Sequence, residues 1–349
     1  DYTFDHLELR GADIEVCREL VEMGASFAGL HKGGKLGLPE VLAAAFQHNA
    51  LPVEKLWEAD TAWRGLGDTG FIESAAVAQE FILKMGAALF PEGVVTAATM
   101  KGYRAMLVTT RANLSHIRWW CHCREDYVAL GHDRIDMDSA FRWHEQGVGP
   151  YARSGTGLRD WESVSVGPLG FKLWAWLRFA DSDVLMNCRD QLLQRFIDVY
   201  HNRGGPKLEL EDLRTHFILA AALDSVQLLD SVPEIYRCWP KDKWTSIKGL
   251  RDKRVLGQTL GQQSLWLCLK SLVNIALVLS SCDIVELLYQ AMPLIFHAAV
   301  HEVGPVEELV AGDTGVEART GTSSGAALLC RLPAGSRLVP TGRQVEAGE

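Results

Sequence analysis

Hydrophobic positions recur along most of the chain at the three- and four-residue spacing of amphipathic helices. Asp13 fits the N-cap of a first helix, because its carboxylate can accept hydrogen bonds from the first backbone N–H groups. One face of that helix carries Val16, Cys17, Leu20 and Val21. The same spacing predicts further helices at residues 40–48, 53–63, 72–89, 95–127, 182–199, 211–229, 255–280 and 283–301.

Glycine and proline interrupt this pattern in the middle and at the end of the chain. Residues 147–157 form the clearest internal loop, and the alternation at 161–166 predicts a short strand. From residue 304 onward glycines are frequent, and only 326–332 and 336–339 have strand character. The predicted regions are a helical region at 1–146, a loop and strand linker at 147–170, a helical region at 171–303 and an extended glycine-rich segment at 304–349. The predicted fold class is mainly α with minor β, with large helical domains, long connecting loops and an extended C-terminal segment.

Composition supports a globular protein with a substantial core. Of the 349 residues, 48% are hydrophobic and 23% are charged, which excludes a disordered chain. Eleven Trp favour large buried anchors or extensive contact surfaces. The net charge of −9 argues against a surface that binds nucleic acid everywhere, although a local basic patch remains compatible with it.

Cysteine usage and hydropathy predict a soluble protein of a reducing compartment. Most of the eight cysteines lie in apolar, helix-like stretches without the spacing of a disulfide framework, so we expect free thiols. The most apolar stretches, 265–279 and 291–300, are too short to span a bilayer. The acidic start does not fit a signal peptide. The absence of an initial Met favours a piece of a longer protein.

Two short motifs match catalytic patterns only by letter. Residues 65–70 read Gly-Leu-Gly-Asp-Thr-Gly, but the dinucleotide fingerprint needs a preceding strand, and residues 53–63 have a helical pattern. Residues 321–325 read Gly-Thr-Ser-Ser-Gly, but a hydrolase nucleophile elbow needs a later His, and the last one is His301. We therefore expect a turn between helices and a flexible loop.

Metal ligation provides the main enzymatic alternative. The candidate ligands are His116, Cys121, Cys123, His297 and His301. His297 and His301 are four residues apart on a predicted helix, but Ala298 stands where a zincin has its Glu. On a helix, Cys121 and Cys123 lie on different faces, which separates the ligands. The alternative function is a soluble helical enzyme, metal-dependent in its chemistry, with a site between His116 and Glu145. The sequence as a whole favours a protein without catalytic residues or cofactors.

A local run of basic residues is the candidate nucleic-acid contact. It contains Lys241, Lys243, Lys248, Arg251, Lys253 and Arg254. Trp244 lies within this run, which only Asp242 and Asp252 offset. Such a run can contact phosphates without reading base sequence. The simpler alternative is a solvated loop and helix start.

The apolar helices, numerous Trp, long glycine-rich connections and extended last stretch together resemble the helix-rich coat proteins of double-stranded RNA viruses of fungi. The resemblance is one of overall pattern across most of the chain, and residues 109–120 are where we expect related sequences to match. It implies a self-assembling capsid subunit that encloses an RNA genome, in the cytoplasm and in the virion. The implied partners are copies of itself or sister capsid subunits, and RNA through phosphate contacts, with no membrane. A helical scaffold that binds host proteins fits the sequence equally well.

Overall fold

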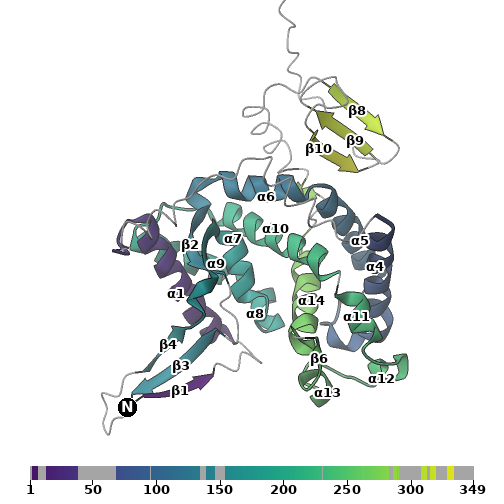
Figure 1. The fold of residues 1–349 in the computed structure, drawn as a ribbon, viewed down its shortest axis with the longest axis horizontal. Helices are drawn as coiled ribbons and strands as arrows, with labels where there is room; N and C mark the ends of the chain where they lie inside the picture. Colours follow the sequence, from purple (N-terminus) through teal and green to yellow (C-terminus); the bar gives the residue numbers. More distant parts are fainter. Residues whose placement is uncertain are drawn as a thin grey trace, which may run out of the picture.

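The computed structural model confirms a mainly helical fold with minor β structure (Figure 1). It describes residues 2–6, 13–37, 68–94, 96–133, 139–145, 154–229, 231–261, 263–282, 286–288, 290, 308–312, 315–319 and 328–333. The helices predicted at 40–48 and 53–63, and nearly all of the one at 283–301, lie outside these residues, as does the Gly-Thr-Ser-Ser-Gly motif. None of the described helices is long and apolar enough to cross a membrane.

The helical elements are α1 (Ile14–Lys32), α4 (Asp68–Glu80), the π-helical η1 (Phe81–Met85), the 3-10 turn η2 (Ala87–Leu89), α5 (Ala97–Ala112), α6 (Leu114–Cys123), the 3-10 turns η3 (Glu125–Tyr127) and η4 (Trp161–Ser163), α7 (Leu169–Leu177), α8 (Ser182–Asn187), α9 (Arg189–Arg203), α10 (Leu210–Leu228), α11 (Val232–Arg237), α12 (Lys241–Thr245), α13 (Lys253–Leu256) and α14 (Leu265–Ser280). The strands are β1 (Tyr2–His6), β2 (Val128–His132), β3 (Ala140–Glu145), β4 (Ser154–Leu158), β5 (Val164–Pro168), β6 (Thr259–Leu260), β7 (Gln263–Ser264), β8 (Glu308–Gly312), β9 (Gly315–Arg319) and β10 (Leu328–Pro333).

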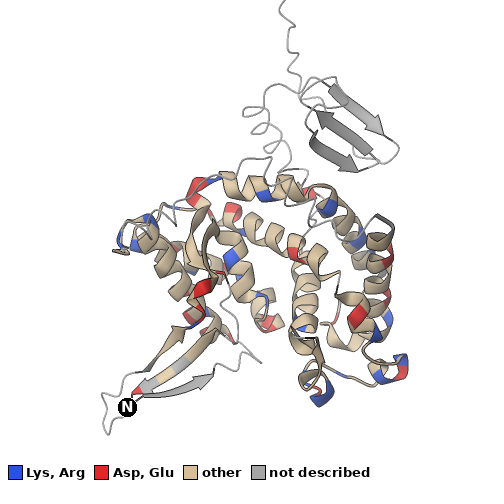
Figure 2. Ribbon diagram, in the orientation of Figure 1, with Lys and Arg blue, Asp and Glu red and all other residues tan. Residues whose placement is uncertain are grey.

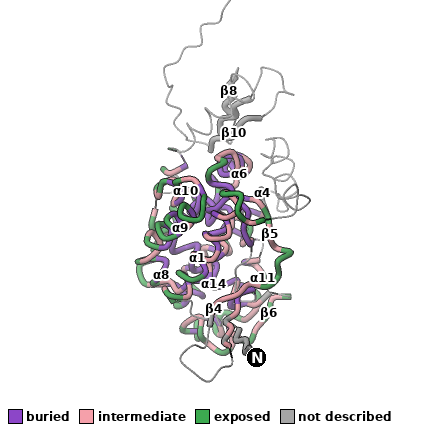
Figure 3. Tube along the Cα trace, turned by 90° about the vertical axis from the view of Figure 1, so that its left-hand side faces the viewer, coloured by how far each residue is buried: buried purple, intermediate pink, exposed green. Residues whose placement is uncertain are grey.

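The core is built around α14, which is buried along almost its whole length, and around the middle of α10, which is buried from His216 to Leu223. Helix α10 packs against α7, α14 and α5, while α1 packs against α9 and β2. Buried side chains from Cys17 to Leu288 form one cluster, so the helical regions on either side of 147–170 share a core. Figure 3 shows these buried stretches gathered at the centre of the helical body. The seven cysteines whose side chains the structure describes are free thiols.

Polar residues in the apolar stretch of α14 hold the turn between α7 and α8. The buried Asn274 donates through Nδ2 to the carbonyl oxygens of Arg178 and Ala180, at 2.7 and 2.9 Å. Lys270, also buried, has its Nζ 3.7 Å from Asp181 Oδ1. Because a buried polar group is costly without a partner, these contacts explain why a helix this apolar keeps Asn and Lys inside the core.

The sheets in the described part of the chain are small and antiparallel, with strand orders β1-β3-β4, β2-β5, β6-β7 and β10-β9-β8. Lys172 on α7 fixes the β2–β5 ribbon, because its buried Nζ donates to Gly131 O, Ser165 O and Asp133 Oδ1 at 3.1, 2.9 and 2.5 Å. The β1-β3-β4 sheet, in contrast, extends away from the helical body (Figure 1).

Several predicted elements need correction. The helix predicted at 95–127 breaks at Asn113, whose side-chain Nδ2 donates to Thr109 O at 2.8 Å and competes with the helical backbone. The one at 182–199 is two helices, α8 and α9, and the one at 255–280 is α13, the β6-β7 hairpin and α14. Gly261, at φ +59°, provides the left-handed turn of that hairpin. Residues 154–157, predicted as loop, belong to β4, and the strand predicted at 161–166 begins only at Val164, after η4.

Candidate nucleic-acid interface

The basic run at 241–254, which we call the basic segment, forms α12, α13 and the turn between them (Figure 2). Pro240 is the N-cap of α12, where its fixed φ suits the start of a helix. Asp252 is the N-cap of α13 and accepts a hydrogen bond from Arg254 N at 3.0 Å. Arg254 also links the two helices, because its Nη1 donates to Ser246 Oγ at 2.7 Å. The six predicted contact residues therefore lie together on one small substructure.

Buried apolar side chains anchor the basic segment to the helical body. Trp244 is fully buried, with its ring centroid 4.9 Å from that of Phe81 and 4.8 Å from that of Trp239. Ile247 and Val255 are buried beside it in the same core cluster. Trp244 is thus a core residue, and it cannot stack on a nucleic-acid base without unfolding the segment.

Most cations of the basic segment are exposed to solvent. Lys241, Lys248, Arg251 and Lys253 are exposed, and none of them forms an ion pair with any residue that the structure describes. Lys243 instead lies over the Trp239 ring, with Nζ 4.5 Å from the ring centroid. Six basic residues against two acidic ones give the segment a formal charge of +4 in a protein of net charge −9.

Arg254 differs from the other cations because it is held by Asp252. Its Nη2 lies 2.6 Å from Asp252 Oδ2, and its Nε lies 2.9 Å from Oδ1. Hydrogen bonds from Arg254 lower the pKa of Asp252 to about 2, so this pair stays charged at neutral pH. Arg254 therefore has a structural role, because it links α12 to α13 within the basic segment. Its predicted contact with nucleic acid stays a prediction.

The structure does not bring the candidate metal ligands of α6 together with further ligands among the described residues. His116 and Cys121 are buried, and burial raises the pKa of the Cys121 thiol well above its ordinary value. The Cys123 thiol donates to Trp120 O at 3.3 Å. Among the described residues, no three His, Cys, Asp or Glu side chains come together as metal ligands. His297 and His301 lie outside those residues, so the metal site stays a hypothesis.

A second cluster, between α6 and α10, was not predicted from the sequence. The His216 ring is stacked 4.8 Å from Tyr127 and lies 4.7 Å from Trp120. Next to it, Arg124 Nη2 donates to Asp212 Oδ2 at 2.7 Å, and the Tyr127 hydroxyl donates to the same oxygen at 3.1 Å. Burial lowers the pKa of His216 to about 3, so the ring is neutral. Asp212 is 85 residues from Tyr127 in the chain, so the spacing of residues in the sequence does not reveal this contact.

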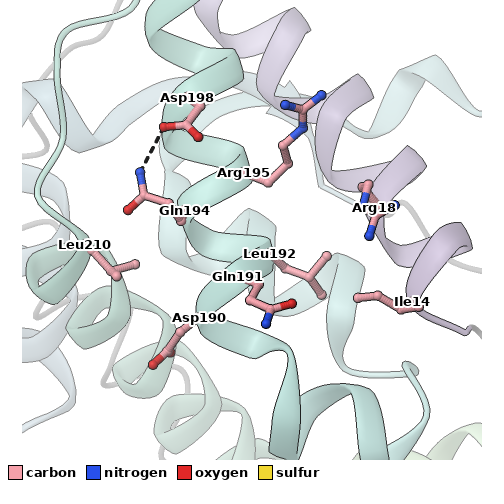
Figure 4. A pocket seen from close by; sticks show the side chains of 9 residues that line it. All are labelled: Ile14, Arg18, Asp190, Gln191, Leu192, Gln194, Arg195, Asp198 and Leu210. Carbon is pink, nitrogen blue, oxygen red and sulfur yellow. Dashed lines mark hydrogen bonds between the residues drawn. The ribbon is translucent and has the colours of Figure 1, made fainter.

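A shallow depression of about 500 Å³ crosses α9 beside the first turns of α1 (Figure 4). Its apolar lining consists of Ile14, Leu192 and Leu210, and Arg18 and Arg195 lie along its α1 side. Both arginines form ion pairs inside the chain, Arg18 with Glu15 and Arg195 with Glu22. The described residues that line it include no His, Cys or Ser. The depression therefore has the composition of a contact surface.

Comparison of the chain with models of known protein families, with characterised proteins and with solved structures found no match.

Proposed function

We propose that this chain is a structural subunit that assembles with copies of itself into a closed shell around RNA, as the resemblance to viral coat proteins implies. The observation that carries this proposal is the basic segment, because its exposed cations, which pair with no described carboxylate, stand on an otherwise acidic protein. Polyanion binding by a few such cations releases counterions from the phosphates and is independent of base sequence. In the assembled shell, this segment faces the RNA interior. The protein then occurs in the cytoplasm and in virions.

The projecting sheet supports the self-assembly part of the proposal. Strands β1 and β4 each pair with β3, so within the part of the chain that the structure describes each has one unpaired edge. Such edges offer rows of backbone N–H and C=O groups to another chain. A Thr156–Glu19 hydrogen bond of 2.7 Å ties β4 to α1, so the sheet is held in its extended position. Neighbouring subunits are the partners that this arrangement suits.

The native mass of the purified protein tests the assembly. Sedimentation velocity is expected to show a large closed species, and negative-stain microscopy is expected to show particles. A monodisperse monomer or dimer would contradict the proposal. If that monomer or dimer also carried stoichiometric zinc, iron or manganese, the alternative function of a metal-dependent enzyme would replace the proposal of a shell subunit.

Salt-dependent binding of a double-stranded RNA fragment tests the role of the basic segment. The test variant replaces with Ala its four exposed cations, Lys241, Lys248, Arg251 and Lys253. It should bind more weakly, and the slope of log K against log salt should fall by about one for each phosphate that the variant no longer neutralises. The matched control replaces four exposed lysines elsewhere, Lys35, Lys84, Lys101 and Lys207.

Both variants change the net charge by the same amount. A loss of RNA binding confined to the basic-segment variant supports a local contact. Equal losses would show that only overall charge matters, and unchanged binding in both would remove the RNA role.

A further inference from the structure

Trp161 is an exposed aromatic side chain held in a fixed position. It is 53% exposed, more than any other large hydrophobic residue among those described as exposed. Its indole Nε1 donates to Leu158 O at 3.0 Å, and its ring is edge-on to those of Phe27 and His132, at 5.6 and 5.8 Å. The ring therefore loses little freedom when a partner covers it, which is the property of a preorganised contact residue.

The backbone beside Trp161 supports the same interpretation. Asp160 has φ +60°, the one positive φ of a non-glycine residue in the described part of the chain. Asp adopts this left-handed conformation more readily than most residues with a side chain. Here it turns the chain between β4 and β5 so that Trp161 projects from the surface.

We propose that Trp161 of one copy inserts into the depression between α1 and α9 of a neighbouring copy. This inference rests on the proposed self-assembly and specifies which side chains form one of the contacts between subunits. The apolar lining of Ile14, Leu192 and Leu210 suits an indole ring, and the guanidinium groups beside it suit the face of an aromatic ring. Tryptophan and arginine are also the residues that most often dominate binding energy in protein interfaces.

The charges of the two surfaces match on the α1 side of the depression. Trp161 lies between the exposed carboxylates of Asp160 and Glu162, and Asp160 lies 3.9 Å from Arg159. Arg18 and Arg195 lie along the α1 side of the depression and Asp190 and Asp198 line its other side, so the proposed contact places the carboxylates beside Trp161 next to the two arginines. The ion pairs that these arginines form within the chain are largely exposed, so they oppose a second carboxylate only weakly. Complementary charges fix the orientation of a contact more than they raise its affinity.

The position of the two surfaces makes the contact heterologous. Phe27, which touches Trp161, is nine residues from Arg18 on α1, and nine residues are two and a half helical turns. The exposed Trp and the depression therefore lie on opposite sides of α1. A subunit cannot fill its own depression, and each copy can engage two neighbours, which produces rings or shells in preference to a closed dimer.

This inference can be tested with two variants, each of which removes one side of the contact. Trp161→Ala removes the inserted ring, and Gln191→Trp fills the depression from an exposed position of α9. Each variant alone should raise the protein concentration at half-assembly at least about tenfold, the effect expected of an interface hot spot. An equimolar mixture should form a 1:1 heterodimer, because the intact Trp161 of the second variant enters the open depression of the first.

The controls change matching residues away from both surfaces. Ile72→Ala removes a 50% exposed side chain of α4, and Gln227→Trp adds an indole at an exposed position of α10. Both should assemble as the unchanged protein does. If Trp161→Ala or Gln191→Trp assembles normally, or if the mixture gives no heterodimer, the contact is wrong while the shell proposal stands. If the unchanged protein stays monomeric, the shell proposal and the contact both fail.

Discussion

Mild acid should destabilise the protein through two buried histidines. His216 and His116 are buried, and desolvation lowers the pKa of His216 to about 3 and that of His116 to about 4. In the unfolded chain both return to about 6.5. As the pH falls below that value, the two histidines become protonated in the unfolded state but stay neutral in the folded state, so the free energy of unfolding decreases.

The size of this effect follows from the two pKa differences. Each histidine lowers the free energy of unfolding by about 1.4 kcal/mol for every pH unit below its pKa in the unfolded chain, until the pH reaches its pKa in the folded protein. At pH 5.0 this amounts to about 2 kcal/mol for each, or about 4 kcal/mol together, relative to pH 7.5. Carboxylates with lowered pKa values, such as Asp212 and Asp190, lose their stabilisation only below about pH 4. The window from pH 7.5 to 5.0 therefore isolates the histidines.

Urea denaturation at these two pH values measures the effect. His216→Phe keeps an aromatic ring between Trp120 and Tyr127 and should recover about 2 kcal/mol of the loss at pH 5.0. His201→Gln, which changes an exposed histidine of α9, should leave the full loss in place. The reasoning is refuted if His216→Phe loses as much stability between pH 7.5 and 5.0 as the unchanged protein.

Further substitutions test the packing, each by urea denaturation at pH 7.5. Gly170→Ala should lower the free energy of unfolding by about 1–3 kcal/mol, because its new Cβ would lie 2.5 Å from backbone and Cβ atoms of His216. Gly102→Ala, in open space on α5, should instead raise it by up to about 1 kcal/mol. Equal effects of the two substitutions would contradict the close approach of Gly170 to His216. Lys172→Met should cost about 2–3 kcal/mol, because it leaves the two strand carbonyls and the carboxylate without their donor, and a neutral result would show that the buried ammonium adds nothing. Trp244→Ala should cost about 3–5 kcal/mol, and a small loss would show that the basic segment does not depend on its anchor.

Local signals made much of the helical structure predictable. Asp13 was predicted as an N-cap, and its Oδ1 accepts from Glu15 N and Val16 N at 3.1 and 3.0 Å. The predicted helix at 211–229 is α10, shifted by one residue at each end. Such features depend on neighbours three or four residues away, which the sequence displays directly.

Pairings between distant residues could not be predicted in the same way. Strands β2 and β5 are separated in the chain by β3 and β4, and their register depends on Lys172 from the following helix. Glycine-rich β4 has no strand propensity of its own, but Phe141 and Trp143 on β3 lie opposite Gly157 and Gly155, and a Cβ at either glycine would meet those rings. A partner strand, which sequence spacing does not reveal, makes this segment a strand.

The basic segment shows which properties of a candidate site can be read from the sequence and which only the structure supplies. A run of six basic residues is visible in the sequence, and so is its contrast with a net charge of −9. Which cations can reach a phosphate depends on three-dimensional neighbours. Arg254 is held by Asp252, Lys243 lies over Trp239, and the four exposed cations form no ion pair with any carboxylate that the structure describes. Because Trp244 is committed to the core, the segment offers charge without a stacking surface. Such a surface presents cations that can contact phosphates, and contacts of that kind do not depend on the base sequence.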